Sequence, residues 1–430
     1  MANNPFDSTF TGRSKSLFAL LPLLAKKTTF IMRKRKLTAE LFLLCLFKSL
    51  FNGKASFQQI AARFGRLSAD SISKQALWKR IDASAIAFLM STFAAALAQR
   101  GKNLTQKHPR LGTLFNRILT EDSTQHRFHH SNVEDFKAHG NGISQTAGVK
   151  VDLTFDLLTG LSVQESIHLA TTQDKEIGKD LIDLVLPNDL ILRDMGYFSL
   201  AEFTIIEEKN AWWLSRTPIN LIITYKGKSL EKTLKKSQTS TIDLEVTLGE
   251  VRKKARLVGM MATPQTAAKN IREAREKARK RGHTLSAEEI ERCRWHLVAT
   301  NVPREMMNVK EISDLYTCRW NIEIIFRAWK QGMNLGGALN RQSNQYHLQA
   351  LVLVAMIYQV LALQIVALLR ARYVEETGQV SIEKVFHDFG EYLSESPNLK
   401  NLKKYHPDWR DIRMDPRKDR KPLIETLLDF

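Results

Sequence analysis

Cysteine is scarce in this chain of 430 residues, which has only Cys45, Cys293 and Cys318. Cysteines so few and so far apart cannot form a disulfide framework, and their spacing matches no zinc motif. The chain also lacks internal repeats and low-complexity tracts. These absences exclude a disulfide-stapled secreted domain and a repeat array, and they favour a reduced, cytoplasmic protein.

Acidic residues are too few to balance the basic ones. The sequence has 64 Lys and Arg against 45 Asp and Glu, which gives a formal net charge of +19, and its isoelectric point is about 9.8. At this length the excess of positive charge favours a polyanionic partner, as expected of an enzyme that acts on nucleic acid.

Uninterrupted apolar runs are also rare. Residues 17–25 follow basic residues as a signal sequence would, but no small-residue cleavage site comes after them. Residues 348–369 are long enough to span a membrane, yet Gln349, Gln359 and Gln364 interrupt them. We therefore expect a core or dimer-interface helix there, and no membrane partner.

Four polar residues recur at helical spacing in one segment, Tyr316, Arg319, Glu323 and Lys330. At about 100° per residue they share a stripe about 60° wide and roughly 21 Å long. Apolar residues fill the adjacent arc, so a core would anchor this helix and the stripe would face a cleft. The arrangement suits a metal ion on the acid and phosphates on the bases, although a solvated helix face would show the same charges.

The spacing Y-x2-R-x3-E-x6-K of these residues resembles the signature of DDE transposases of bacterial insertion sequences, in the branch known for those four letters. All four positions match. The resemblance implies that Glu323 is the third of three catalytic carboxylates. It also implies that two aspartates lie upstream, on strands of a ribonuclease H-like sheet.

Asp122 and Asp194 are the candidates for those two aspartates. Asp122 follows an apolar run and opens the letters D-S-T, which would place it at the end of a buried strand. Asp194 ends the apolar run 190–193, and a helix with the spacing of a capping box, Ser199 to Glu202, follows it. The patterns D-S-T and D-x-G-Y-F are both similar to those of the family.

The resemblance further implies roles for these residues. Asp122, Asp194 and Glu323 would bind two Mg²⁺ ions, for which Mn²⁺ could substitute, because divalent cations about 3.5–4 Å apart need hard oxygen ligands. Tyr316, Arg319 and Lys330 would hold phosphates near the cleaved DNA end. Relatives also hold a flipped base with a tryptophan, and no tryptophan lies between Trp213 and Trp295 in this chain.

The periodicity predicts a sheet that could carry these acids. A hairpin is expected over residues 151–170, a helix over 175–186, and strands that end at Asp194 and Leu214. The stretch between Asp194 and Glu323 is too long for one helix and one strand. We therefore expect a mainly β insertion there, and its many lysines and arginines favour DNA contact over a solvated surface.

The N-terminal part is helical and basic. One amphipathic helix is expected to end at Gly65, and a second, over residues 72–81, exposes Lys74, Gln75 and Lys79. The pair resembles a helix-turn-helix whose second helix reads DNA, although two short helices of any bundle would show the same pattern.

The expected fold is α/β, a ribonuclease H-like core interrupted by a β insertion and preceded by a helical DNA-binding domain. The expected parts are an N-terminal domain (1–110), the first part of the core (111–216), the basic insertion (217–290), the second part of the core (291–375) and a C-terminal segment (376–430).

The expected function is cut-and-paste transposition. Such an enzyme binds the terminal inverted repeats of its insertion sequence, cleaves the strands and transfers them into target DNA. It would act as a homodimer in the bacterial cytoplasm, associated with the nucleoid. The expected partner is double-stranded DNA. Three alternatives remain: a ribonuclease H-like nuclease or recombinase without strand transfer, a transposase-derived DNA-binding regulator, and a membrane protein built on residues 348–369.

Overall fold

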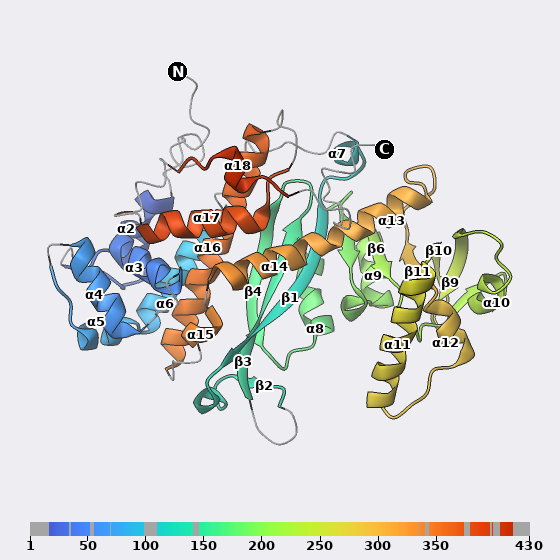
Figure 1. Ribbon diagram of the computed structural model, residues 1–430, viewed down its shortest axis with the longest axis horizontal. Coiled ribbons are helices and arrows are strands. Elements are labelled where there is room, and N and C mark those ends of the chain that lie inside the picture. Colours follow the sequence, from blue (N-terminus) through green and yellow to red (C-terminus); the bar gives the residue numbers. More distant parts are fainter. Residues whose placement is uncertain are drawn as a thin grey trace.

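The computed structural model describes residues 17–33, 36–51, 56–68, 70–98, 110–140, 146–333, 335–339, 344–373, 379–395, 398 and 405–415. Figure 1 shows a helical body at one end, a central group of long strands, and a lobe of strands and short helices at the other end. Much of the C-terminal segment expected at 376–430 lies outside the described residues.

The helical body combines the two ends of the chain. Its N-terminal helices are α2 (Leu17–Lys27), α3 (Ala39–Phe51), α4 (Phe57–Leu67), α5 (Lys74–Arg80) and α6 (Ala83–Ala98). Its C-terminal helices are α15 (Leu335–Leu339), α16 (Gln345–Arg372), α17 (Ile382–Glu395) and α18 (Trp409–Ile412). Helix α16 packs on α3 and α6, and both sets share one hydrophobic core. The expected break at Gly65 is wrong, because α4 continues to Leu67.

Helix α16 is long and apolar enough to cross a membrane, with a mean hydropathy of 2.4 over its most apolar window. Every residue of that window is buried inside the protein. Two of the glutamines that interrupt the run have partners there: Gln359 donates to the Glu165 carboxylate at 3.1 Å and Gln364 to the Ala96 carbonyl at 3.0 Å. The helix therefore forms the centre of the helical body.

One mixed sheet runs through the rest of the described chain, in the order β2-β3-β1-β5-β6-β11-β10-β9-β7-β8, with β4 also paired to β3. Its first strands are β1 (Ile118–Phe128), β2 (Lys137–Ala138), β3 (Thr146–Asp156) and β4 (Leu161–Leu169), with the short helices α7 (Leu111–Leu114) before β1 and η1 (His130–Asn132) after it. The expected hairpin is confirmed, and its turn has Gly160 at φ +71°.

The prediction that Asp122 ends a strand is wrong. Strand β1 pairs antiparallel with β3 from Leu119 to Phe128, so Asp122 lies inside the strand, opposite Leu153. The strand continues because Thr124, His126 and Phe128 alternate into the interior. The apolar residues just before it belong to α7 and the loop that follows.

Strand β5 (Leu190–Arg193) ends immediately before Asp194, as predicted. The helix α8 (Asp174–Leu184) precedes it, and the turn η2 (Met195–Tyr197) and helix α9 (Leu200–Glu208) follow. Ser199 caps α9 by accepting from the Glu202 backbone N–H at 3.4 Å. The expected capping box is incomplete, because the Glu202 carboxylate binds Arg193 instead.

The insertion extends the same sheet. Its elements are β7 (Ile223–Tyr225), β8 (Lys228–Ser229), α10 (Leu230–Leu234), β9 (Thr241–Leu248), β10 (Lys253–Met261), α11 (Pro264–Lys280) and α12 (Ala287–Arg292). Strand β11 (Trp295–Thr300) then pairs with both β10 and β6 (Trp212–Arg216), which joins the insertion to the central strands. Figure 1 shows this lobe at the end of the molecule opposite α4 and α5.

The polar stripe lies on two helices joined by a tighter turn. Helix α13 (Val309–Thr317) carries Tyr316, the 3₁₀ turn η3 (Cys318–Trp320) carries Arg319, and α14 (Asn321–Gly332) carries Glu323 and Lys330. The expected single helix is therefore corrected at η3. In Figure 1, α13 and α14 form one nearly continuous rod that crosses the sheet, and α14 contacts β1.

The close approach of β1 and β3 generates a stability prediction. A Cβ atom at Gly148 would lie 2.6 Å from the backbone oxygen of His126. We expect Gly148→Ala to lower the free energy of unfolding by about 1–3 kcal/mol, measured by urea denaturation. In the control Gly65→Ala the new Cβ meets nothing within 4 Å and helix propensity favours alanine. Equal stability of the two variants would contradict the close strand packing.

Candidate functional site

The sheet brings Asp122 and Asp194 to neighbouring strands. Strands β1 and β5 run parallel, and their last paired residues are Thr120 and Leu192. Asp122 and Asp194 each lie two residues further along. Because side chains alternate between the faces of a strand, both aspartates point away from the face covered by α8. They face the rod of α13, η3 and α14.

Arg319 joins the three candidate acids. Its guanidinium lies 2.9 Å from a Glu323 carboxylate oxygen, 3.5 Å from one of Asp122 and 3.9 Å from one of Asp194. The Arg319 side chain is only 11% exposed, whereas the acids are 27% to 38% exposed. The structure therefore brings Asp122, Asp194, Glu323 and Arg319 together in one partly open cluster.

Tyr316 and Lys330 lie at the two ends of this cluster. The Tyr316 hydroxyl donates to Asp194 at 3.4 Å, and burial beside that carboxylate raises the pKa of Tyr316, so it remains a phenol. Lys330 is exposed in the last turn of α14. Partial burial lowers the pKa of Lys330, and the charge of Asp122 opposes this shift. Glu323 of the stripe is one of the acids, and the other three residues of the stripe thus surround or flank them.

The electric field of the cluster favours a positive charge at its centre. Burial raises the pKa of Asp122 to about 6, and repulsion from Glu323 and Asp194 adds to the rise. Arg319 and the Ser123 backbone N–H, which donates to Asp122 at 2.8 Å, act in the opposite direction. The Arg319 pKa is raised, because the acids and Tyr316 together outweigh its burial.

Divalent cations fit the chemistry of the cluster but not its present spacing. Three carboxylates supply the hard oxygen ligands that Mg²⁺ and Mn²⁺ prefer. Within the described ranges, however, no three His, Cys, Asp or Glu side chains stand close enough together to hold a metal ion. The Arg319 guanidinium lies between the acids.

A second polar group, on the opposite face of the sheet, escaped the sequence analysis. Glu121 and Arg193 each precede a candidate acid by one residue, are fully buried and lie 3.5 Å apart. Burial raises the pKa of Glu121 to about 7, and Arg193 opposes that rise. The sequence could have indicated Glu121 and Arg193 only through their charge, because each closely follows the apolar start of a buried strand.

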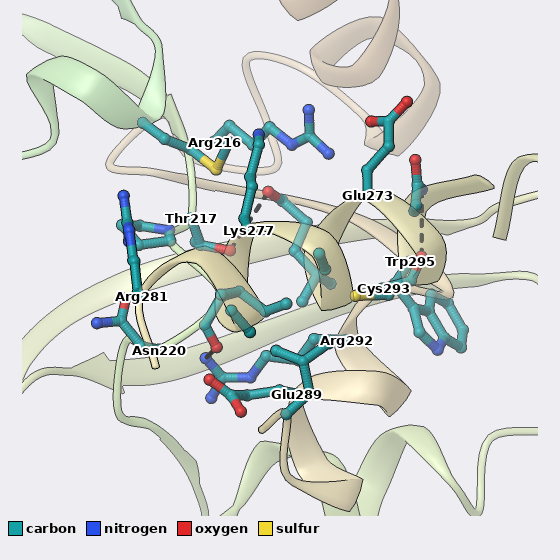
Figure 2. Close-up of a pocket in the computed structure, with 18 of the residues that line it drawn as sticks. Arg216, Thr217, Asn220, Glu273, Lys277, Arg281, Glu289, Arg292, Cys293 and Trp295 are labelled. Atoms are coloured by element: carbon teal, nitrogen blue, oxygen red, sulfur yellow. Dashed lines mark hydrogen bonds between the residues drawn. The ribbon is translucent and has the colours of Figure 1, made fainter. Parts of the chain in front are cut away.

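A pocket of about 320 Å³ lies beside the acids. Met195, the neighbour of Asp194, and Arg216 line it from the central strands, and α11 and α12 of the insertion complete it. Figure 2 shows Arg216, Lys277 and Arg281 around one part of the pocket and Trp295 at another. The positive charge at this junction is suited to a phosphate-bearing ligand.

The structure does not bring the N-terminal candidates to the acids. Lys74, Gln75 and Lys79 are exposed on α5, which caps its N-terminus with Ser73 and buries Leu77. This helix belongs to the helical body, and Figure 1 shows it away from the insertion lobe. Any role of these three residues therefore concerns a surface separate from the acid cluster.

Comparisons with known proteins agree on one family. The model of the transposase DDE domain matches residues 114–360. The transposase for insertion sequence element IS231C of Bacillus thuringiensis subsp. berliner is 29% identical over 335 residues, which cover 73% of this chain and 70% of that protein. The transposase for insertion sequence element IS1151 of Clostridium perfringens is 28% identical over 333 residues, covering 71% and 70%.

Among solved structures, the piggyBac transposase synaptic complex with hairpin DNA is similar with a TM-score of 0.46 and 10% sequence identity. That match covers 93% of this chain and 83% of the other.

The raised pKa of Asp122 predicts how stability depends on pH without metal. The pKa of Asp122 is 3.8 in the unfolded chain and about 6 in the folded protein. Its contribution to stability is therefore fully present below about pH 3.8 and is lost as pH rises through about 6. We expect Asp122→Asn to raise the free energy of unfolding by on the order of 2 kcal/mol at about pH 8, and little at about pH 4. Urea titrations with a chelator measure both, and an equal gain at both pH values would contradict the prediction.

Proposed function

The chain belongs to the transposase DDE domain family, and from this premise we propose that Asp122, Asp194 and Glu323 are its three catalytic acids. The protein is a DDE transposase, an enzyme that acts on DNA, and its family uses divalent metal ions. One observation carries the residue assignment: three carboxylates, from strand β1, the turn after β5 and helix α14, surround a single guanidinium.

The finer family assignment rests on the stripe. We propose that the chain belongs to the branch with the Y-x2-R-x3-E-x6-K signature, because Tyr316, Arg319, Glu323 and Lys330 all face or flank the acids. The antiparallel strands β4, β3 and β1, followed by parallel β5 and β6, support a ribonuclease H-like core. The five-part division of the chain, with a basic insertion at 217–290, remains our proposal.

The proposed reaction divides the work between acids and bases. Asp122, Asp194 and Glu323 would hold two Mg²⁺ ions, which would supply activation of the attacking oxygen and stabilisation of the leaving oxygen. Tyr316 orients Asp194 through its hydroxyl. Arg319 exchanges its carboxylate partners for phosphate oxygens of the DNA end, and Lys330 holds a phosphate further along the strand.

The complete activity we propose is cut-and-paste transposition. The enzyme binds the terminal inverted repeats of its own insertion sequence, cleaves the strands and joins them to target DNA. Two protomers would assemble with two ends in the bacterial cytoplasm, at the nucleoid. A nuclease without strand transfer would use the same acids, so a joined product with a target plasmid distinguishes the two.

The pocket beside Met195 is the place we propose for the flipped base that the family resemblance implies. Trp295 lines this pocket. It is the tryptophan that follows the stretch 214–294, which contains no tryptophan. Arg216 and Lys277 line the same pocket and could pair with the phosphates of that nucleotide. The pocket thus lies between the turn that follows Asp194 and the helices of the insertion.

Recognition of the terminal repeat is proposed for α5. Lys74, Gln75 and Lys79 are exposed there, while Leu77 anchors the helix in the core. The helices α4 and α5 resemble a helix-turn-helix, in which the second helix enters the major groove, although the connection at 68–73 is longer than usual for that motif. Basic and amide side chains are the ones that read base edges.

The acids generate the first functional prediction. Asp122→Ala, Asp194→Ala and Glu323→Ala should each abolish cleavage of terminal-repeat DNA but leave binding of that DNA largely intact, because basic residues supply most of the affinity. Ca²⁺ should support binding and little cleavage. The control Asp183→Ala removes an exposed acid of α8 and should cleave normally. Cleavage near the wild-type rate in any of the three would remove that residue from the site.

The stripe generates a second prediction. Lys330 lies two turns, about 10 Å, beyond Glu323 on one helix, so it should reach a neighbouring phosphate. Arg319→Ala and Lys330→Ala should slow single-turnover cleavage, and Lys330→Arg should retain more activity than Arg319→Lys, because an ammonium cannot reproduce a bidentate contact. Wild-type cleavage by Lys330→Ala would leave that residue as part of a solvated face.

The proposed reader helix is tested by changing Lys74, Gln75 and Lys79 together to alanine. Because base contacts specify sequence and phosphate contacts only position the protein, discrimination between the terminal repeat and random DNA should fall more than nonspecific binding does. The control replaces the exposed Lys26 and Lys27 of α2. Titrations at one salt concentration measure the ratio, and an unchanged ratio would place recognition elsewhere, most simply in the basic insertion.

A further inference from the structure

A buried polar network lies behind the three acids, on the other face of the sheet. Because side chains alternate along β1 and β5, Glu121 and Arg193 point toward α8 while Asp122 and Asp194 point toward the site. Glu121 and Arg193 have no exposed surface. Glu121 therefore directly precedes Asp122 in the chain, and Arg193 directly precedes Asp194.

Arg193 is the centre of this network. Its guanidinium donates to the Gly178 carbonyl of α8 at 2.5 Å, to the Tyr197 carbonyl of η2 at 3.3 Å and to the Glu202 carboxylate of α9. The Glu121 carboxylate lies 3.5 Å away and, among the described residues, has no hydrogen-bond partner. One side chain thus links β1, β5, α8, η2 and α9.

The packing around Arg193 leaves little room for adjustment. A Cβ atom at Gly178 would lie 3.0 Å from the Tyr197 ring, 3.3 Å from the Arg193 guanidinium and 3.4 Å from Glu121. The Tyr197 hydroxyl in turn donates to Asp152 of β3 at 3.3 Å. The network therefore fixes the turn that begins at Asp194 against the two strands beside it.

Stability alone is a weak reason to bury this charge. Apolar side chains of similar volume often replace a buried ion pair without loss of stability, because desolvation offsets much of the attraction. A guanidinium differs from such a replacement in having donors at fixed angles, which orient several acceptors at once. The network is suited to fixing geometry, and the nearest geometry to fix is that of Asp122 and Asp194.

We propose that Arg193 is a positioning residue, which sets the separation and orientation of Asp122 and Asp194 from the far side of the sheet. The proposal rests on the proposed function, since it takes the two aspartates as metal ligands. Groups that orient metal ligands typically change metal affinity or activity by about 10- to 100-fold when removed. Arg193 would act through the backbone of β5 and η2 rather than by touching DNA.

The test replaces the network with neutral residues of similar volume. The triple variant Glu121→Gln, Arg193→Met, Glu202→Gln removes the three charges together, so none of them is left buried without its partner and the variant should fold. Bound to a precut terminal-repeat duplex, it should hold Mn²⁺ about 10- to 100-fold more weakly than the wild type, measured by electron paramagnetic resonance of free Mn²⁺. Cleavage of intact ends at low Mn²⁺ should fall in proportion and recover as Mn²⁺ is raised.

The matched control lies at the other end of the same two strands. Arg117, just before β1, donates to the Asp189 carboxylate, just before β5, at 2.5 and 3.1 Å. The double variant Arg117→Met, Asp189→Asn removes an ion pair that joins the same strands far from the acids. It should lower stability and leave Mn²⁺ affinity unchanged.

The outcomes separate the two proposals. Wild-type Mn²⁺ affinity in a folded triple variant would overturn the role of Arg193. If that variant does not fold, Arg193→Lys keeps the charge but loses the fixed donors, and wild-type Mn²⁺ affinity there would overturn the role equally. If Asp122→Ala also binds Mn²⁺ and cleaves normally, the proposed acids themselves are wrong. Weak Mn²⁺ binding confined to the network variants and the acid variants supports both.

Discussion

The contact of three carboxylates with the Arg319 guanidinium is the interaction on which the site depends. Two carboxylates about 4 Å apart repel by about 4 kcal/mol at an effective dielectric constant of about 20, so such a cluster needs a cation. Arg319 supplies it, at 2.9 to 3.9 Å from Glu323, Asp122 and Asp194. Under the proposed function, metal ions would bind the three carboxylates while DNA phosphates bind Arg319. The two events would occur together, because each ligand takes one side of the present ion pairs and frees the other side.

The remainder of the fold holds the acids in place. The parallel pairing of β1 and β5 sets two of them side by side, and the buried Arg193 network supports both from behind. The turn η3 directs Arg319 into the cluster from a rod whose apolar face packs in the main core. The insertion extends the sheet past β11 and contributes one wall of the pocket beside Met195. The positions of the acids thus depend both on local turns and on contacts between residues that are distant in the sequence.

Much of this arrangement could be predicted from the sequence, since short-range signals carry it. The strand before Asp194 and the hairpin at Gly160 are local patterns, and both are confirmed. The single helix expected for the stripe is wrong, because the turn η3 separates α13 from α14. The position of Asp122 inside β1 could not be predicted, because pairing with β3 extends that strand. The sequence predicts that the Glu202 carboxylate closes a helix cap, but in the structure it binds the buried Arg193 of the preceding strand instead. Such choices depend on tertiary contacts.

The most direct test is a structure of the protein bound to a cleaved terminal-repeat end with Mn²⁺, whose anomalous signal locates the ions. We expect Mn²⁺ bound by oxygens of Asp122, Asp194 and Glu323, with the Arg319 guanidinium moved onto a DNA phosphate. Mn²⁺ bound away from these acids, with Arg319 still between them, would show that the three acids do not form the metal site.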